Sequence, residues 1–217
     1  MFSKMFLYIF SGYLCLQEGI DMQIRFATVA DTDALLKIYS QYIDTTITFE
    51  YVLPGPQEFA ERIRSIGAFY PYLVAEEDGR IVGYAYSSRA FERAAYSWCA
   101  DLSIYLDRNY RSHGLGRTLY ELLFKISQLQ GLNLVFGVVT GTNAPSIAFH
   151  KALGFKVVGD FPQNGFKNHA WLNVLWLAKE LLPARDNPAP VQSVANLDQA
   201  QLRELLEQAA ATLSAPQ

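Results

Sequence analysis

A glycine-containing stretch in the middle of the chain could bind a phosphate. Residues 111–117 read Arg-Ser-His-Gly-Leu-Gly-Arg, between an apolar run, Asp101 to Leu106, and an amphipathic run, Thr118 to Leu129. Two glycines allow a tight turn that brings successive backbone N–H groups to one point at the start of a helix, where they can bind phosphate or pyrophosphate. The spacing Arg-x-x-Gly-x-Gly differs from those of nucleotide hydrolases and dinucleotide enzymes. A plain glycine-rich turn before a helix is the alternative interpretation.

A second stretch, some thirty residues later, places polar side chains on one side of a predicted helix. The helix opens at Asn143, in the segment Asn-Ala-Pro-Ser, and ends near Gly154. Asn143, Ser146 and His150 are three or four residues apart, so they share one helix face with Gly154. Asn143 is a favourable N-cap residue, and Gly154 is a favourable residue just after the last turn.

In their order and separation, these two stretches resemble the GNAT superfamily of acyl-CoA-dependent N-acyltransferases. The resemblance implies that the glycine loop holds the pyrophosphate of coenzyme A and that Asn143 faces its pantetheine arm. It also implies that Ile104 and Leu106 offer backbone N–H groups to the thioester oxygen. His150 stands where the family often has a tyrosine that protonates the departing thiolate. The residues expected to bind acetyl-CoA are Ile104, Tyr105, Leu106, Arg111, Ser112, His113, Gly114, Leu115, Gly116, Arg117, Asn143 and Ser146.

A narrower resemblance, to the phosphinothricin N-acetyltransferase branch, covers roughly Met22 to Leu182. It rests first on the segment Ala-Ala-Tyr-Ser-Trp at residues 94–98, which leads to Asp101. The shorter matching segments are Thr48-Phe49-Glu50, Tyr72-Leu73-Val74-Ala75-Glu76, Gly83-Tyr84-Ala85, Gly165-Phe166-Lys167 and Trp171. The resemblance implies the GNAT fold, which is α/β (α+β by some schemes) with a mixed, mostly antiparallel central sheet flanked by helices.

Asp101 is the candidate general base, and His150 is the second candidate catalytic residue. A carboxylate inside an apolar strand is costly to bury unless it is paired, so Asp101 is expected to have a functional role. The alternative interpretation is that Asp101 forms a salt bridge at the end of the strand. The resembling branch has Glu at this position, so the Asp carboxylate would lie roughly 1.5 Å further back. A bridging water or a deeper acceptor would compensate for this difference. His150 could protonate the thiolate or take the amine proton with Asp101 as its support; a packed histidine is the alternative.

Three further residues are expected to contact the acceptor. Arg93 suits a carboxylate, because its guanidinium binds both oxygens at once, although a solvated surface arginine is the alternative. Tyr96 belongs to the same region, and Phe49 is a candidate wall residue. Cys99 shows no paired histidine, which favours direct attack by the amine over an acyl-enzyme.

The expected reaction moves the acetyl group of acetyl-CoA to the α-amine of a small amino acid or an analogue. Phosphinothricin and methionine sulfoximine or sulfone are such analogues. Two alternatives stay open. One is acetylation of a different amine, such as a polyamine or a protein N-terminus, and the other is a non-catalytic acyl-CoA-binding sensor. Turnover of any amine with acetyl-CoA separates the sensor from the enzymes.

Composition excludes some partners. The 217 residues include 18 Lys and Arg against 21 Asp and Glu, a net charge of −3 without a basic stripe, so nucleic acid is not expected. Cys15 and Cys99 lack paired or metal-ligand spacing, which predicts reduced thiols and a cytoplasmic location. The three histidines form no metal motif, so no metal is expected. No membrane partner is expected, and the family resemblance implies a homodimer.

The elements that must position these residues alternate between strand and helix. Strands are expected over Gln23–Ala27, Tyr72–Glu77, Ile81–Ser88, Ala95–Leu106, Leu134–Thr140, Lys156–Phe161 and Trp171–Leu181. Helices are expected over Asp31–Tyr42, Gln57–Ile66, Thr118–Leu129, from Asn143 to Gly154 and over Leu197–Leu213. A mixed sheet covered by helices buries this pattern.

Four regions follow from these elements. Residues 1–21 contain an apolar run, Met5 to Leu16, which has no clean cleavage site after it and is too short and interrupted for a confident membrane span, so Met22 is the expected natural start. The Gln-Glu-Gly segment just before it can be encoded by a purine-rich ribosome-binding sequence; a genuine extension or signal remains the alternative. Residues 22–182 form the expected acetyltransferase domain, 183–196 a Pro-rich linker, and 197–217 a short C-terminal helix or tail. That helix could pack on the domain, pack on a partner or fray.

Overall fold

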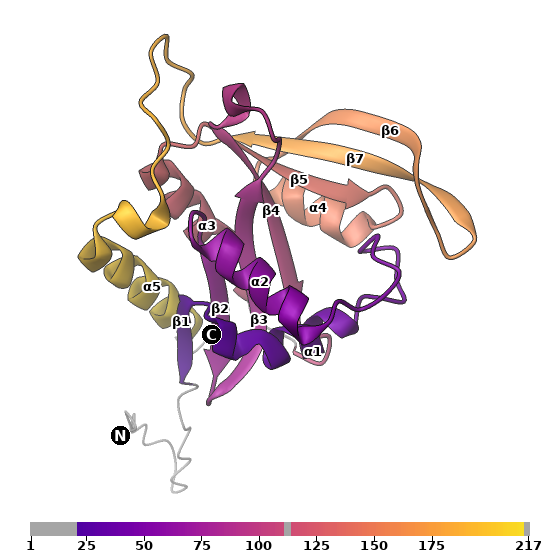
Figure 1. The fold of residues 1–217 in the computed structure, drawn as a ribbon, viewed down its shortest axis with the longest axis horizontal. Coiled ribbons are helices and arrows are strands. Elements are labelled where there is room, and N and C mark those ends of the chain that lie inside the picture. The colour runs from indigo at the N-terminus through magenta and orange to yellow at the C-terminus, as the bar shows by residue number, and fades with distance from the viewer. Residues whose placement is uncertain (1–20, 111–113, 215–217) are drawn as a thin grey trace, which may run out of the picture.

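A computed structural model describes residues 21–110 and 114–214. In these residues seven strands form one sheet in the order β1-β2-β3-β4-β5-β7-β6, in which β4 and β5 are parallel and every other pair is antiparallel (Figure 1). The strands are β1 (Met22–Phe26), β2 (Tyr72–Glu77), β3 (Arg80–Arg89), β4 (Cys99–Leu106), β5 (Leu134–Thr140), β6 (Lys156–Lys167) and β7 (Ala170–Glu180). The helices are α1 (Thr32–Ser40), α2 (Pro56–Gly67), α3 (Leu115–Gln130), α4 (Ala144–Ala152) and α5 (Gln199–Ser214).

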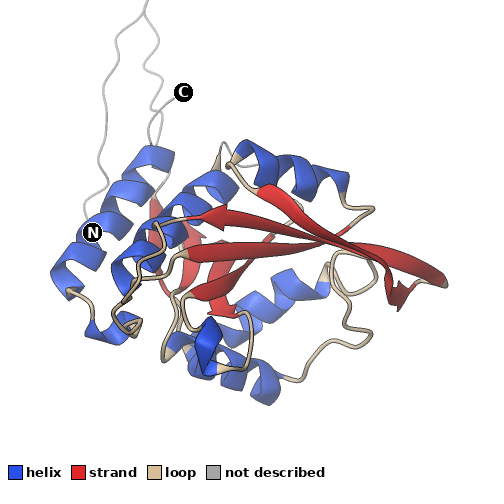
Figure 2. Ribbon diagram, turned by 90° about the horizontal axis from the view of Figure 1, so that it is seen from above, coloured by secondary structure: helices blue, strands red, loops and turns tan. Residues whose placement is uncertain are grey.

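The sheet lies between two layers of helices, as Figure 2 shows. Helices α1 and α2 cover one face, where Leu35, Phe59 and Ile63 pack against Val74 and Tyr84. The larger core lies on the other face, under α3, α4 and α5; its side chains include Leu73, Ala85, Leu102, Leu119, Leu123, Val135, Leu177 and Leu202. Because side chains alternate along a strand, β2, β3 and β4 supply residues to both cores. The predicted mixed, mostly antiparallel sheet flanked by helices is confirmed.

The two parallel strands separate after three residue pairs. Cys99–Asp101 pair with Leu134–Phe136, whereas β4 stays paired with β3 as far as Leu106. In the described part of the chain, Leu102–Leu106 therefore have no strand on the β5 side. We call this opening, which begins after Asp101 and Phe136, the fork.

Two expected strands have different limits in the structure. The strand expected over Ala95–Leu106 begins only at Cys99, because Ala94–Tyr96 form a 3-10 turn in which the Ser97 hydroxyl donates to the Ala94 carbonyl. The strand expected to end at Phe161 continues to Lys167 through a register shift between Phe161 and Gly165. The resulting β6–β7 hairpin extends past the helices at one end of the molecule (Figure 2).

The C-terminal helix packs on the domain. Leu202, Leu206 and Ala210 of α5 are buried in the same core as the α3 side chains, and α5 lies against β1 and α3. The segment before α5 also contacts the sheet end, where the Trp98 indole donates to the Ala189 carbonyl. Residues 1–20, and with them the expected N-terminal extension and Cys15, lie outside the described residues.

Candidate active site

Asp101 lies at the start of the fork. It forms the last residue pair between β4 and β5, opposite Phe136. Alternation along β4 puts its side chain on the α1–α2 face together with Tyr105, which packs against Tyr39 and Tyr42 of α1. The carboxylate is half-buried, and its Oδ1 atom is buried without a hydrogen-bond partner in the described residues. The salt bridge considered for Asp101 is not found there.

Burial gives this carboxylate the properties of a general base. Removal from water disfavours the charged form and raises the pKa of Asp101 to about 6. A carboxylate with such a pKa is mostly ionised at pH 7 and takes a proton more readily than an exposed one. The neighbouring Cys99 is a poor nucleophile, because burial and the charge of Asp101 raise the pKa of its thiol. Its Sγ instead donates to the Tyr96 carbonyl, 3.1 Å away.

A buried Tyr–His pair occupies the opposite face of the fork. His150 is only 3% exposed, and its Nδ1–H donates to the Ser146 carbonyl 2.8 Å away. Its Nε2 atom is therefore an acceptor, 3.1 Å from the Tyr120 hydroxyl. Burial lowers the pKa of His150, so its ring is neutral.

The Tyr120–His150 pair contacts both β4 and β5 at the point where these strands diverge. The Tyr120 hydroxyl lies 3.4 Å from the Leu102 carbonyl on β4. On β5, a Cβ atom at Gly137 would lie 2.4 Å from His150 Nε2, so only glycine fits there. His150 and Asp101 are thus on opposite faces of the sheet, and support of His150 by Asp101 is not what the structure shows. Sequence reasoning missed Tyr120, because it fits the apolar stripe of a helix and nothing local distinguishes it.

The first turn of α3 lies against the open half of β4. A Cβ atom at Gly116 would contact the side chains of Phe149, Ile104 and Leu106 at 3.6–3.7 Å. Gly114 precedes the helix with a φ of 104°, a conformation that glycine adopts without strain. The helix N-terminus therefore lies beside the fork, where its N–H groups can face an anion. The Arg111, Ser112 and His113 positions of the predicted loop lie outside the described residues.

Two backbone N–H groups of β4, those of the residues predicted to bind the thioester, point into the fork. The N–H of Asp107 bonds to the Val82 carbonyl of β3, and backbone groups alternate along a strand. The N–H groups of Ile104 and Leu106 therefore point away from β3, to the side where β5 has diverged. These donors, together with the glycines of α3, fit an acyl thioester and its pyrophosphate.

The other residues predicted to bind the cofactor do not all lie at the fork. Tyr105 points into the aromatic core of the α1–α2 face, so its side chain is not at the fork. Leu115 is fully buried, and Arg117 pairs with Glu121 on the exposed side of α3. The Asn143 side chain caps α4, accepting a hydrogen bond from the Ser146 N–H at 3.3 Å. Ser146 is thereby linked both to this cap and to His150.

Aromatic side chains border Asp101 on the α1–α2 face. Phe91 packs against Tyr96, Phe136 and Trp176 with ring centroids 4.8–5.9 Å apart. Tyr96 is 48% exposed, so this apolar surface reaches solvent beside the base. Arg93 is exposed at the start of the 3-10 turn and makes no ion pair within the described residues.

Phe49 approaches from a different element, the loop between α1 and α2. Its ring packs on Gly165 of β6, where a Cβ atom would lie 2.4 Å from the ring. The loop reaches the β5 end of the sheet as well, because the Thr140 hydroxyl donates to the Thr46 carbonyl. The structure thus brings Phe49 to the same face of the sheet as Asp101.

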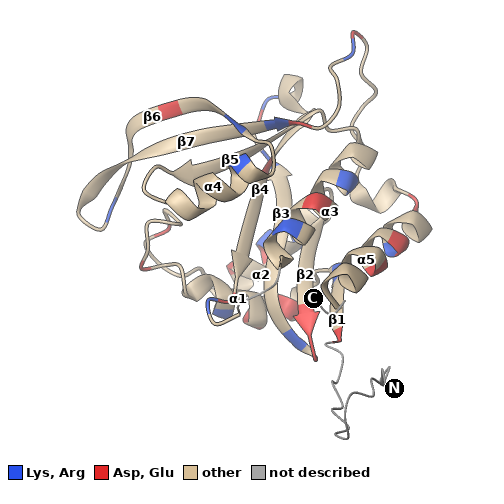
Figure 3. Ribbon diagram, turned by 180° about the vertical axis from the view of Figure 1, so that it is seen from behind, with Lys and Arg blue, Asp and Glu red and all other residues tan. Residues whose placement is uncertain are grey.

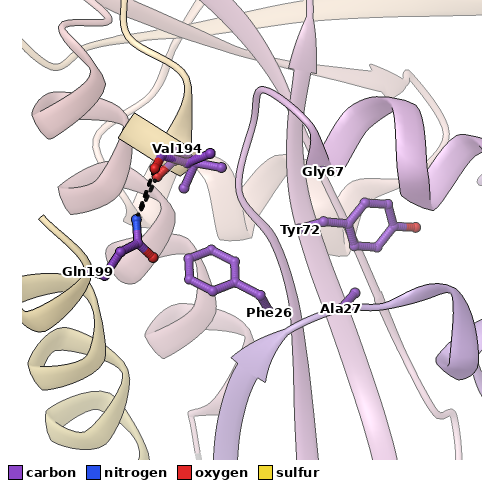
Figure 4. Close-up of a pocket in the computed structure, with 7 residues that line it drawn as sticks. Phe26, Ala27, Gly67, Tyr72, Val194 and Gln199 are labelled. Atoms are coloured by element: carbon purple, nitrogen blue, oxygen red, sulfur yellow. Dashed lines mark hydrogen bonds between the residues drawn. The ribbon is translucent and has the colours of Figure 1, made fainter. Parts of the chain in front are cut away.

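A separate cavity of about 100 Å³ is drawn in Figure 4 and lies where the C-terminal segment meets β1 and α2. It is lined by Phe26, Ala27, Gly67, Tyr72, Val194, Ala195 and Gln199. No carboxylate, imidazole or thiol lines it, so it offers no acid–base chemistry. Within the described residues no group of three His, Cys, Asp or Glu side chains could hold a metal, and no helix is long and apolar enough to cross a membrane.

Comparison with known proteins gives consistent matches. Residues 24–176 match the family model of the acetyltransferase (GNAT) domain. Phosphinothricin N-acetyltransferase of Streptomyces viridochromogenes is 35% identical over 182 residues, which are 83% of this chain and 98% of the relative. L-Methionine sulfoximine/L-methionine sulfone acetyltransferase of Pseudomonas paraeruginosa is 33% identical, covering 76% and 98%. The crystal structure of a phosphinothricin acetyltransferase from Sinorhizobium meliloti in complex with AcCoA matches with a TM-score of 0.74 and 31% identity, covering 82% and 98%.

Proposed function

The chain belongs to the acetyltransferase (GNAT) family, and on that premise we propose that it acetylates the amine of a small amino acid or an analogue, using acetyl-CoA. It is an acyl-CoA-dependent acetyltransferase. The names of its relatives support phosphinothricin-like and methionine sulfoximine-like acceptors. The observation that carries the proposal is the half-buried Asp101 at the fork, with one carboxylate oxygen unpartnered.

The reaction can be followed from the residues at the fork. Acetyl-CoA supplies an activated acyl carbon and a thiolate leaving group. Asp101 accepts one proton from the acceptor's ammonium group, which frees the nitrogen lone pair. The nitrogen then bonds to the thioester carbon while the carbon–sulfur bond breaks. The nitrogen loses its second proton, and the thiolate gains one, leaving an N-acetyl product and free CoA.

The two proton transfers are assigned to opposite faces of the sheet at the fork. Asp101 serves the amine on the α1–α2 face, and the Tyr120–His150 pair lies on the other face, where a departing thiolate would need a proton. Because His150 Nδ1 is committed to Ser146, the mobile proton of the pair is the one between Nε2 and the Tyr120 hydroxyl. We assign the thiolate side to this pair.

The backbone provides the remaining contribution. The N–H groups of Ile104 and Leu106 point into the fork and can bind the oxygen on which negative charge develops. The start of α3 can hold the pyrophosphate, which fixes the thioester relative to Asp101 and so supplies the positioning part of the rate. Arg93, Tyr96 and Phe49 are the proposed acceptor contacts, with Arg93 binding the carboxylate. We propose a cytoplasmic location, because acetyl-CoA is available in that compartment.

An amine panel assayed for release of free CoA tests the proposal. We expect phosphinothricin, methionine sulfoximine and methionine sulfone to be acetylated with higher kcat/KM than spermidine or an N-terminal peptide. Preference for the polyamine or the peptide would contradict the proposed acceptor class. Acetyl-CoA binding without turnover of any amine would identify a sensor instead.

A further inference from the structure

Two short segments that the proposed mechanism leaves largely unused contact one another along their length. They are Thr48–Tyr51, in the loop after α1, and Gly165–Lys167, at the end of β6. The Phe49 ring packs on Gly165 so closely that a Cβ atom would lie 2.4 Å from it. The Tyr51 hydroxyl donates to the Phe166 carbonyl. The two segments therefore form one unit although more than a hundred residues separate them in the sequence.

Lys167 fixes the position of this loop. Its ammonium donates to the carbonyls of Ile43, Thr48 and Glu50, each at 2.7 Å, and so uses all three of its N–H groups. The side chain is 3% exposed, and burial lowers its pKa. A buried lysine bound to three carbonyls of one loop constrains the backbone on both sides of Phe49.

The loop holds Glu50 in an incompletely paired state. Glu50 Oε1 binds the Arg62 guanidinium at 2.6 Å. Its other oxygen, Oε2, is buried and has no hydrogen-bond partner among the described residues. A buried carboxylate oxygen without a donor costs free energy. The loop imposes this cost, since Lys167 determines where the Glu50 backbone lies.

Glu50 and Asp101 both lie on the α1–α2 face of the sheet, where their charges act on Tyr86. Tyr86 of β3 pairs with Ser103, and Asp101 is two residues before Ser103 on the same side of β4. Burial raises the pKa of Tyr86, and the charges of Glu50 and Asp101 both add to the rise. The loop that carries Glu50 also reaches β4 on this face, because the Thr48 hydroxyl lies 2.7 Å from the Tyr39 hydroxyl and the Tyr39 ring packs on Tyr105 with centroids 5.0 Å apart. Glu50 Oε2 and Asp101 Oδ1 are both buried carboxylate oxygens that lack donors among the described residues.

We propose that Glu50 binds the acceptor's ammonium group beside Asp101, and that Lys167 is the positioning residue that holds Glu50 there. This rests on the proposed function. A primary ammonium brings three N–H donors, which can satisfy both unpartnered oxygens at once. Asp101 then takes one proton, while Glu50, held by Arg62, keeps its hydrogen bond to the amine during attack. The acceptor class is therefore a primary ammonium.

Steady-state kinetics of two matched variants test the role of Glu50. Glu50→Gln should raise the KM for phosphinothricin at least tenfold and leave the KM for acetyl-CoA within twofold. The control is Glu58→Gln, because Glu58 binds the same Arg62 but its side chain is 59% exposed. We expect both KM values of Glu58→Gln to stay within twofold of wild type. Equal KM values for Glu50→Gln and Glu58→Gln, with wild-type turnover intact, would overturn this inference alone; a wild-type enzyme that acetylates no amine would overturn the proposed function too.

A second pair of variants tests the positioning role of Lys167. Lys167→Met should raise the KM for the amine. The double variant Lys167→Met/Glu50→Gln should have a KM for the amine no higher than that of the more impaired single variant, because both changes remove the same contact. Effects that multiply would show that Lys167 acts independently of Glu50. If Glu50→Gln does not fold, Glu50→Asp replaces it: this variant keeps the charge, and an unchanged KM for the amine would contradict the contact.

Discussion

At the scale of single residues, the central feature is a carboxylate kept where water cannot fully solvate it. Asp101 has a buried, unpartnered Oδ1 atom, and its pKa is raised to about 6. The same burial that makes Asp101 a better base makes the charged form unfavourable in the folded protein. The position of Asp101 therefore has two consequences: it makes the carboxylate more basic, and it places a destabilising charge inside the folded protein.

This linkage predicts how stability depends on pH. The folded pKa of Asp101 lies above its ordinary value of 3.8, so protonation favours the folded state. The stability that Asp101 contributes is full below pH 4 and is lost as the pH rises through about 6. Asp101→Asn, which cannot ionise, should therefore melt about 3 °C above wild type at pH 8 and much closer to it at pH 4. A difference in Tm that does not change with pH, measured by circular dichroism, would contradict the buried charge.

At the scale of elements, the fork and the first turn of α3 make one site from three segments. Parallel β4 and β5 pair over three residues and then diverge, and α3 begins beside the opening. Glycine at 116 keeps the helix backbone close to Ile104 and Phe149. The start of α3 therefore lies directly against the part of β4 that β5 leaves open.

A larger side chain at this position should therefore block the cofactor. We expect Gly116→Trp to weaken acetyl-CoA binding more than tenfold in isothermal calorimetry. Gly116→Ala is the control for folding, because its Cβ would make ordinary contacts at 3.6–3.7 Å. A folded Gly116→Trp variant with wild-type affinity would remove the start of α3 from the site.

The sequence predicts elements better than contacts. Helical periodicity and the caps Asn143 and Gly154 locate α4 almost to the residue, because these signals are local. The turn residues between Phe161 and Gly165 hide the continuation of β6, which depends on pairing with β7. The contacts of Tyr120 with His150, and of Lys167 with the loop at Thr48, join segments that are far apart. Only tertiary packing determines such contacts.

At the scale of the whole molecule, the two ends of the sheet differ. At one end, α5 covers β1 with Leu202 and Leu206. The apolar face of α5 is therefore buried on the domain and is not available to a partner, which was one of the alternatives considered from the sequence. At the other end, β6 is an edge strand, and Val158 and Trp171 of its hairpin are 60% and 63% exposed. Charges of both signs are mixed along α3 and α5 (Figure 3).

An exposed edge with apolar side chains favours pairing between copies. We predict a homodimer of the 24.4 kDa chain that forms through the β6–β7 hairpin. Light scattering should give about twice the chain mass for wild type and a monomer for Val158→Asp. A monomeric wild type would reject the dimer, and a dimeric Val158→Asp would move the interface away from this edge.

The pH dependence of kcat/KM for phosphinothricin, measured with saturating acetyl-CoA, tests the assignment of Asp101 most directly. Because the pKa of Asp101 is about 6, wild-type activity should fall tenfold per pH unit below that value. Asp101→Asn should be at least a hundredfold slower at pH 7.5, with most of the loss in kcat, and should show no such fall. Asp101→Glu should keep the activity and the fall. Wild-type rates in Asp101→Asn, or the same acidic limb in that variant, would contradict the account and place the base elsewhere.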